Sequence, residues 1–191
     1  GAPANVVCAL RKLEVPAAFI GCLGDDEYGR EFIRLFQQLN INIDFLQIAK
    51  QASTRIVKVM RDESGDRSFS GFEVTKSSSF ADEMLDKLLL NTNIKNLKKL
   101  FLNTKYIVTG TNLLAFSQSS DALYFILDFA KKFKIKIIID VNWREIFWEN
   151  SNIDKDAKLK KVKKFLHHAD ILKLANEEAY LFFNTSDPSE I

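Results

Sequence analysis

The chain has 191 residues, of which 47% are apolar and 27% charged, and its formal net charge at pH 7 is +2. This composition is typical of a soluble globular domain and excludes a disordered chain, while the small net charge predicts no polyanionic partner. No run of about 18 apolar residues occurs, so we expect no helix that spans a membrane and a cytoplasmic location. The two cysteines, Cys8 and Cys22, fit neither a disulfide framework nor a zinc site.

Apolar periodicity alternates between the strand and the helix pattern along the chain. Short apolar strands are expected at 18–23, 43–48, 106–109, 136–141 and 170–174. Helices are expected at 3–13, from Asp26 as N-cap to about Leu39, at 119–133, from Lys155 onward and at 177–183. Short buried strands separated by helices indicate an α/β fold whose parallel sheet is covered on both faces.

One segment interrupts this alternation. Residues 54–60 and 67–72 have the pattern of two strands around a turn at 63–66, which predicts a β-hairpin. The hairpin is polar and lies between elements of the α/β pattern, so we interpret the region near residues 54–72 as an inserted flap.

Glycine is scarce, with seven residues and none after Gly110, so we expect no glycine-rich phosphate loop beyond that point. Gly21, Gly24 and Gly29 form neither a Walker loop nor a dinucleotide fingerprint, because the acidic residues at 25–27 would repel a phosphate. A tight strand-to-helix turn with an acidic first helical turn is the preferred interpretation.

Polar side chains leave the strand at 136–141 at alternate positions, as Asp140, Asn142 and Arg144. In open parallel sheets, ligands bind beyond the carboxyl ends of the strands, so we expect these three to have a functional role. A structural salt bridge within the loop is the alternative. Glu177 and Glu178 begin the last helix, where acids favour the helix dipole, and a magnesium-linked role would require phosphates beside them.

Two further features have a simple structural alternative. The small residues and the amide of Gly1-Ala-Pro-Ala-Asn5 would let a polar ligand approach closely, although a plain first turn of a helix explains them as well. Six lysines between 155 and 164 surround an apolar stripe, which is typical of a solvated helix face. Nucleic-acid binding would require interleaved arginine and aromatic residues, so we expect no nucleic-acid partner.

Together these segments resemble the PfkB (ribokinase-like) family of carbohydrate kinases, on its fructokinase-like side. Gly1-Ala-Pro-Ala-Asn5 and the segment 19–29 are similar to the N-terminal signature of that family, and the hairpin is similar to its β lid. Asp140-Val-Asn-Trp-Arg144 with Trp148 resembles the D-x-N-x-R-x-x-x-W run of fructokinases and ketodeoxygluconate kinases. The segment 173–178 resembles the one that carries an Asn-x-x-Glu motif, and the similarity covers essentially the whole chain.

The resemblance implies a single, incomplete three-layer α/β/α sandwich over residues 1–191, with a mostly parallel central sheet and a lid inserted at 52–76. It implies transfer of a phosphoryl group from ATP, with Mg²⁺, to a sugar hydroxyl, and a homodimer formed through the lid. Substrate-binding positions of the family carry over to Gly1, Ala2, Asn5, Asp140, Asn142 and Arg144. Nucleotide-binding positions carry over to Lys173 and Glu178, and the metal-linked position to Glu178.

The chain departs from the family pattern at several places. Ala175 stands where the family has the Asn of Asn-x-x-Glu, and the nearest cation to the usual lid arginine is Lys76. The family's first strand and its Asp-Thr-x-Gly-Ala-Gly-Asp loop, which carries the catalytic aspartate, have no counterpart. We therefore expect a chain that is incomplete at both ends, has no catalytic residue of its own and is inactive alone. The alternative is a non-catalytic kinase homologue that acts as a scaffold or binding protein.

Overall fold

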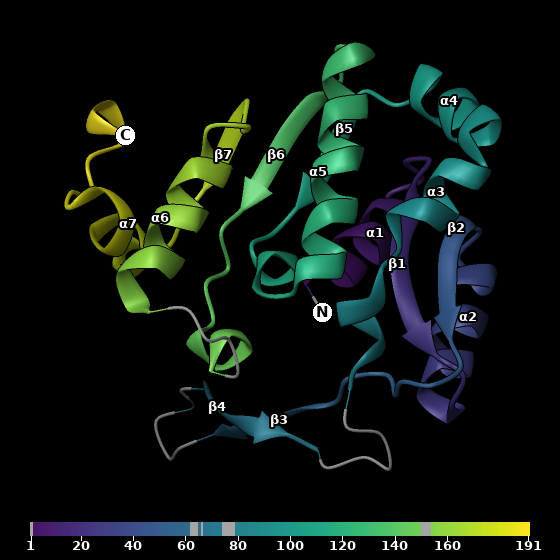
Figure 1. Ribbon diagram of the computed structural model, residues 1–191, viewed down its shortest axis with the longest axis horizontal. Helices are drawn as coiled ribbons and strands as arrows, with labels where there is room; N and C mark the ends of the chain where they lie inside the picture. Colours follow the sequence, from purple (N-terminus) through teal and green to yellow (C-terminus); the bar gives the residue numbers. More distant parts are fainter. Residues whose placement is uncertain (1, 62–64, 66, 74–78, 150–153) are drawn as a thin grey trace. The chain divides into compact units, whose positions relative to one another are not determined.

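The computed structural model describes residues 2–61, 65, 67–73, 79–149 and 154–191 (Figure 1). The chain forms two compact units, one of residues 6–85 and one of residues 1–5 with 86–191, and each is described by itself. The predicted turn at 63–66 lies, apart from Gly65, outside the described residues.

The unit of residues 6–85 is built around a parallel pair of strands. Its elements are α1 (Ala2–Lys12, begun in the other unit), β1 (Ala18–Gly24), α2 (Glu27–Gln38), β2 (Asn42–Ala49), β3 (Val57–Arg61), β4 (Arg67–Phe72) and the 3-10 helix η1 (Ala81–Met84). β1 and β2 pair in parallel, with α2 as the crossover helix between them. Phe36 of α2 is fully buried, and its ring centroid lies 5.0 Å from that of Phe19 on β1.

The turn between β1 and α2 is held by Asp26. Its Oδ1 accepts a hydrogen bond from the Gly29 amide at 2.8 Å as the N-cap of α2, and its Oδ2 accepts one from the Thr54 amide at 2.6 Å. The Thr54 hydroxyl accepts from the Gly24 amide at 3.0 Å. A Cβ added at Gly29 would overlap the carbonyl oxygen of Gly24, so the turn requires glycine there. The predicted tight turn with an acidic cap is confirmed.

The predicted hairpin is confirmed, because β3 and β4 pair antiparallel. Its first strand begins at Val57, three residues later than the pattern predicts. The difference has a physical reason, since Ser53 forms a parallel bridge with Phe80 and the Thr54 amide donates to Asp26. These backbone groups are therefore used at the base of the hairpin and do not extend its ladder.

The other unit contains a three-stranded parallel sheet in the order β5–β6–β7. Its elements are α3 (Lys87–Thr92), α4 (Ile94–Leu102), β5 (Tyr106–Thr109), η2 (Asn112–Ala115), α5 (Ser117–Lys132), β6 (Lys136–Asp140), η3 (Glu145–Trp148), α6 (Lys155–Leu166), β7 (Ile171–Lys173), α7 (Asn176–Phe183) and η4 (Pro188–Glu190). Ile137 and Ile139 of β6 are buried and form the centre of this core. Parallel strands alternate with helices, which confirms the α/β class (Figure 1).

One local feature of the fold goes beyond the sequence pattern. The helical region after the flap divides into η1, α3 and α4, because the Asp86 side chain accepts from the Leu88 amide at 2.6 Å and starts a new helix. In the part of the chain that is described, no helix has both the length and the apolar character needed to cross a membrane.

The Asp26 contacts predict a pH-dependent stability. Burial raises the pKa of Asp26, but hydrogen bonds from the Gly29 and Thr54 amides outweigh burial and leave the pKa below its ordinary value of 3.8. A lowered folded-state pKa contributes stability above the unfolded pKa, and this contribution is lost as the pH falls. We expect Asp26→Asn to lower the free energy of unfolding by about 1 kcal/mol at pH 7, with a smaller difference at pH 3.

Urea unfolding at the two pH values measures this difference. Asp25→Asn is the matched control, because the side chain of Asp25 is exposed and, among the described residues, its ion pair is with the exposed Arg30. An equal effect of the two substitutions would contradict the assigned role of Asp26. So would a loss of unfolding free energy in Asp26→Asn that is as large at pH 3 as at pH 7.

Candidate functional site

The carboxyl ends of β5, β6 and β7 meet at one edge of their sheet. Ile139 of β6 pairs with Thr109 of β5, and Asp140 pairs with Lys173 of β7. Because the strands are parallel, the loops that follow all three leave from this edge, where ligands of open α/β sheets bind. The predicted site residues 140–144 and 173–178 begin at the last residues of β6 and β7 and continue into the segments that follow, with 176–178 in α7.

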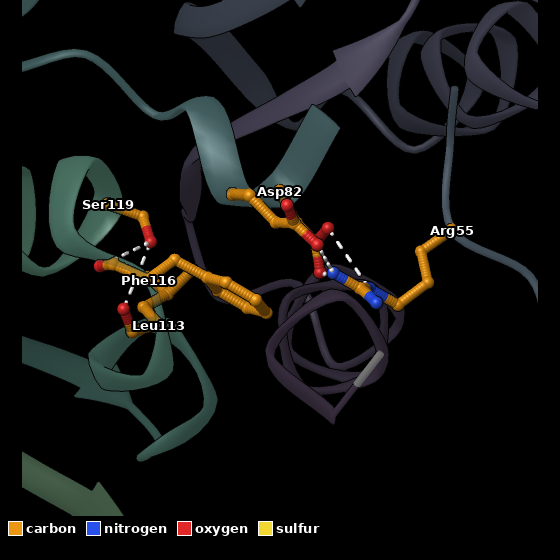
Figure 2. A network of polar contacts seen from close by, with 6 residues as sticks. Arg55, Asp82, Leu113, Phe116 and Ser119 are labelled. Carbon is orange, nitrogen blue, oxygen red and sulfur yellow. Dashed lines mark hydrogen bonds and ion pairs between the residues drawn. The ribbon is translucent and has the colours of Figure 1, made fainter. Parts of the chain in front are cut away.

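The loop after β5 is fixed against the end of β6. The hydroxyl of the fully buried Thr111 donates to the Val141 carbonyl at 2.6 Å. A Cβ added at Gly110 would lie 3.1 Å from the Asp140 carbonyl oxygen, so the two backbones approach closely here. Further along this loop, the Ser119 hydroxyl donates to the Leu113 carbonyl at 2.9 Å, where α5 begins (Figure 2). The edge of the sheet is thus held by buried hydrogen bonds.

An ion pair joins β6 to β7 at the site. Lys173 Nζ lies 2.7 Å from Asp140 Oδ1, and the Lys173 side chain is 69% exposed. Exposed ion pairs contribute at most about 1 kcal/mol to stability, so the fold does not require this pair. A second pair at the amino ends of the same strands, Lys136 Nζ to Asp170 Oδ1 at 2.6 Å, has the same exposed character.

The segment that follows Asp140 has a constrained backbone. Asn142 has φ of 43°, in the left-handed region that Asn tolerates better than most residues. Trp143 packs with its ring centroid 5.3 Å from that of the buried Trp148 and 5.7 Å from that of Phe182. Arg144 Nη1 donates to the Trp143 carbonyl at 2.6 Å. Trp143 therefore anchors the loop between the two polar residues that flank it.

The Glu178 carboxylate ties this loop to α7. Its Oε1 accepts from the Trp143 amide at 2.7 Å and its Oε2 from the Ala175 amide at 2.9 Å, while the residue is only 9% exposed. Hydrogen bonds to an ionised acceptor are about twice as strong as neutral ones. Of the two neighbouring acids that begin this helix, Glu178 is thus built into the structure and Glu177 is exposed.

Ala175 is the N-cap residue of α7 and has an extended backbone, with φ of −79° and ψ of 160°. This is the conformation in which Ser, Thr, Asp or Asn would cap the helix through its side chain. The methyl group of alanine has no acceptor to offer. Only the reverse half of a capping box, from the Ala175 amide to Glu178, is formed.

The N-terminal site residues are placed only in part. Gly1 lies outside the described residues, and Ala2 and Asn5 lie in the first turns of α1, where Asn5 is exposed. Among the described residues, neither donates or accepts a hydrogen bond with the segment 140–144. The structure thus brings Asp140 to Lys173 and Trp143 to Glu178, while the grouping of Ala2 and Asn5 with them stays a prediction.

One lysine of α6 supports the site instead of lying free on a solvated face. Lys161 Nζ donates to the Leu114 carbonyl at 2.7 Å and lies 6.0 Å from the centroid of the Trp148 ring. Burial lowers the pKa of this lysine. Lys161 thereby links α6 to the loops after β5 and β6, a role that its place among six lysines conceals.

Neither Thr111 nor Lys161 stands out in the sequence as a residue of the site. Thr111 follows a predicted strand end, and that position is the only signal that could have found it. The partners of Lys161 lie on other elements, and no local pattern predicts them.

The described residues contain no group of three or more His, Cys, Asp or Glu side chains arranged to hold a metal ion. Magnesium does not require such a cage, because it keeps several waters and is held by one or two carboxylates together with substrate phosphates. Each Glu178 oxygen already accepts one backbone hydrogen bond in a buried position. The donor set therefore fits an indirect contact with magnesium better than a direct one.

The fold is that of known sugar kinases. A fructokinase from Xylella fastidiosa superposes with a TM-score of 0.80 at 24% identity, covering 96% of this chain and 52% of the other. A fructokinase from Vibrio cholerae O395, solved in a fructose, ADP and calcium ion bound form, superposes with a TM-score of 0.79 at 23% identity, covering 100% of this chain and 56% of the other. These likenesses establish a ribokinase-like α/β fold, as the sequence predicts.

The sequence relatives and the family model identify the family to which the chain belongs. A probable fructokinase-5 of Arabidopsis thaliana is 28% identical over 178 residues, which cover 93% of this chain and 51% of the relative. The fructokinase of Salmonella typhimurium is 25% identical over 98% of this chain and 56% of its own length. The model of the pfkB family of carbohydrate kinases matches residues 1–191, so the chain belongs to that family. It spans about half the length of the curated relatives it matches.

The two hydrogen bonds of Glu178 predict a large cost for a conservative change. Glu178→Gln keeps one acceptor but places an amide donor against the second backbone N–H, which leaves that part-buried N–H without its acceptor. We expect the free energy of unfolding to fall by about 1–3 kcal/mol in chemical denaturation. Glu177→Gln, one position earlier and exposed, is the matched control and should change it by less than about 0.5 kcal/mol.

The N-cap position of α7, where Ala175 offers no side-chain acceptor, predicts that a substitution can raise stability. Ala175→Asn supplies the missing acceptor for the first turn of α7, and we expect about 1 kcal/mol of added stability in the same measurement. Ala175→Leu, which adds volume without an acceptor, is the control. A gain of the same size from Leu, or none from Asn, would show that helix capping does not limit stability here.

Proposed function

We propose that the whole protein is a fructokinase-like carbohydrate kinase that transfers a phosphoryl group from ATP to a hydroxyl of a sugar. The observation that carries this proposal is the Lys173–Asp140 ion pair at the carboxyl edge of the sheet, with Asn142 and Arg144 in the loop that follows Asp140, in a chain of the pfkB family. The names of the relatives and the fructose and ADP bound to the Vibrio cholerae neighbour support the substrate class. A primary hydroxyl of a ketose is the expected acceptor.

Each site residue has a role that its chemistry allows. Asp140 and Asn142 offer an acceptor and an amide to sugar hydroxyls, and Arg144 offers a planar cation to the transferring phosphate. Gly1, Ala2 and Asn5 are proposed to complete the sugar site, as small residues and an amide at the start of a helix. None of these residues is proposed as the base that takes the proton of the sugar hydroxyl.

The nucleotide side of the site involves Lys173 and Glu178. Lys173 is the exposed cation at the edge, and release from Asp140 would let its ammonium group pair with a nucleotide phosphate. Mg²⁺ supplies charge neutralisation of the phosphates when bound. Glu178 is proposed to act on it through a water, because both its oxygens already accept backbone amides.

The domain, its partners and its location remain part of the proposal. Residues 1–191 are treated as one kinase domain with the hairpin at 52–76 as its lid. A homodimer through the lid is favoured by the exposed Val59 and Met60 on β3, which are 49% and 59% exposed. A cytoplasmic location and the lack of a nucleic-acid partner stay predictions.

The two ion pairs between β6 and β7 give a matched test of the site. In the whole protein, we expect Lys173→Met to raise the KM for ATP by roughly tenfold or more, the effect of losing one charge-assisted contact. Lys136→Met removes the equivalent cation at the opposite end of the same strands and should leave the KM within about twofold. Initial rates with D-fructose and with a panel of other sugars measure both values, and failure to phosphorylate any sugar would refute the enzyme assignment.

A second candidate function follows from one observation. Ala175 replaces the family Asn beside Glu178, which weakly favours a non-catalytic homologue that binds a partner. The same sugar panel decides between the two functions. If the wild-type protein binds ATP in calorimetry but phosphorylates none of the sugars, the scaffold function is favoured.

We propose that the catalytic step requires residues other than residues 1–191. No glycine follows Gly110, so the last part of the chain has no glycine-rich loop whose amides could stabilise the transferring phosphoryl group. We expect an isolated polypeptide of residues 1–191 to release no ADP in response to sugar. Sugar-dependent ADP release from that polypeptide, above a no-sugar control, would disprove this.

A further inference from the structure

Three separate segments of the unit of residues 6–85 meet at Arg55. Arg55 lies just before the hairpin, Phe72 is the last residue of β4, and Phe80 to Glu83 follow the hairpin. The Arg55 side chain is only 7% exposed, which is unusual for an arginine. Other side chains therefore enclose Arg55, which the sequence pattern did not predict.

The guanidinium group of Arg55 is held by two carboxylates. Its Nε lies 2.9 Å from Asp82 Oδ2 and 3.1 Å from Asp82 Oδ1, and its Nη2 lies 2.6 Å from Glu83 Oε1. Figure 2 shows the guanidinium facing the Asp82 carboxylate. The two acidic side chains are 34% and 26% exposed, so this is a partly buried network and not an isolated surface pair.

Two aromatic rings also contact the cation. The Arg55 guanidinium carbon lies 4.4 Å from the centroid of the Phe72 ring and 4.0 Å from that of the Phe80 ring. The two rings also contact each other, with centroids 5.5 Å apart. Arginine suits this position because its planar group stacks on aromatic rings and bonds carboxylates at the same time.

The neighbouring residues fix the same place by other means. Ser53 forms a parallel bridge with Phe80, and the Ala81 amide donates to the Ser53 carbonyl at 2.9 Å. The Thr54 amide donates to Asp26 in the turn between β1 and α2. A two-stranded hairpin is marginally stable by itself in water, so its position depends on how its base is held.

We propose that Arg55 is a positioning residue that closes the base of the β3–β4 hairpin, by holding the end of β4 and the segment 80–83 to the strand entry at residue 55. The hairpin is thereby held in one orientation before any ligand binds. The catalytic consequence rests on the proposed kinase function: a lid with a fixed base has less conformational freedom to lose when it covers a sugar, and it excludes water better from the phosphoryl group.

The conformational part can be tested without any substrate. In the ligand-free whole protein, hydrogen–deuterium exchange is followed in peptides that cover β3–β4 and, for comparison, β1 and α2. We expect Arg55→Met to speed exchange in β3 and β4 by at least about tenfold, because the local opening of the hairpin becomes easier. Met keeps the apolar contact with the two rings but removes the cation. Unchanged β3–β4 exchange, or an equal increase in β1 and α2, would overturn the proposal.

Further variants distinguish the specific role of Arg55 at the base of the hairpin from a general effect of losing an arginine. Arg30→Met removes an exposed arginine of the same unit, whose pair with Asp25 is 57% and 53% exposed, and should leave β3–β4 exchange unchanged. Adding Asp82→Asn to Arg55→Met removes a carboxylate left without its cation and should bring exchange part of the way back. If Arg55→Met does not fold, Arg55→Lys replaces it and is expected to give a smaller increase, since lysine keeps the charge but not the fork. Exchange as slow as in the wild type for Arg55→Lys would overturn the role of the fork.

The catalytic part is tested with D-fructose and ATP. We expect Arg55→Met to raise the KM for the sugar and the ratio of sugar-independent ATP hydrolysis to phosphoryl transfer by several-fold. A change in exchange with neither kinetic value altered would limit Arg55 to the hairpin and refute its positioning role in the reaction. A wild-type protein that phosphorylates no sugar would instead refute the proposed function, and the exchange data would still decide whether Arg55 holds the hairpin.

Discussion

A single buried carboxylate joins the loops on which the candidate site depends. Glu178 accepts one backbone amide from the loop after β6 and one from the start of α7, and so fixes where Asn142 and Arg144 can lie. The parallel sheet brings the strand ends to one edge, but it does not by itself determine how the loops beyond that edge are arranged. The Glu178 carboxylate determines that arrangement, because each of its two oxygens binds a different segment.

At the base of the hairpin, one charged side chain likewise binds groups from different segments, but it is a donor and not an acceptor. There a donor, the Arg55 guanidinium, takes the place of the acceptor and binds two carboxylates between two rings. Glu178 and Arg55 are both largely buried, and both bind groups far away in the sequence. Removing either leaves several partners unsatisfied, which is costly in a largely buried position.

The sequence predicts the elements well because their causes are local. Asp26 as a cap and the strand at 106–109 follow from periodicity and from side-chain chemistry within a few residues. The division of the region after the hairpin and the later start of β3 are determined by hydrogen bonds that no window of a few residues contains. Arg55 lies 27 residues from Asp82, so its role is visible only once the chain is folded. For the site, the segment 140–144 could be found because three polar residues at a strand end have no packing reason, whereas Thr111 and Lys161 look ordinary until their partners are known.

The two ion pairs between β6 and the β7 side also match the direction in which these strands pair. On β6 the cation Lys136 comes first and the anion Asp140 last, whereas on the β7 side the anion Asp170 comes first and the cation Lys173 last. Side by side in the same direction, opposite charges meet at both ends. If one strand were reversed, lysine would face lysine and aspartate would face aspartate, and like charges opposite each other are destabilising. The pattern of four charges thus favours the parallel arrangement modestly, for two strands whose apolar residues alone would accept either direction.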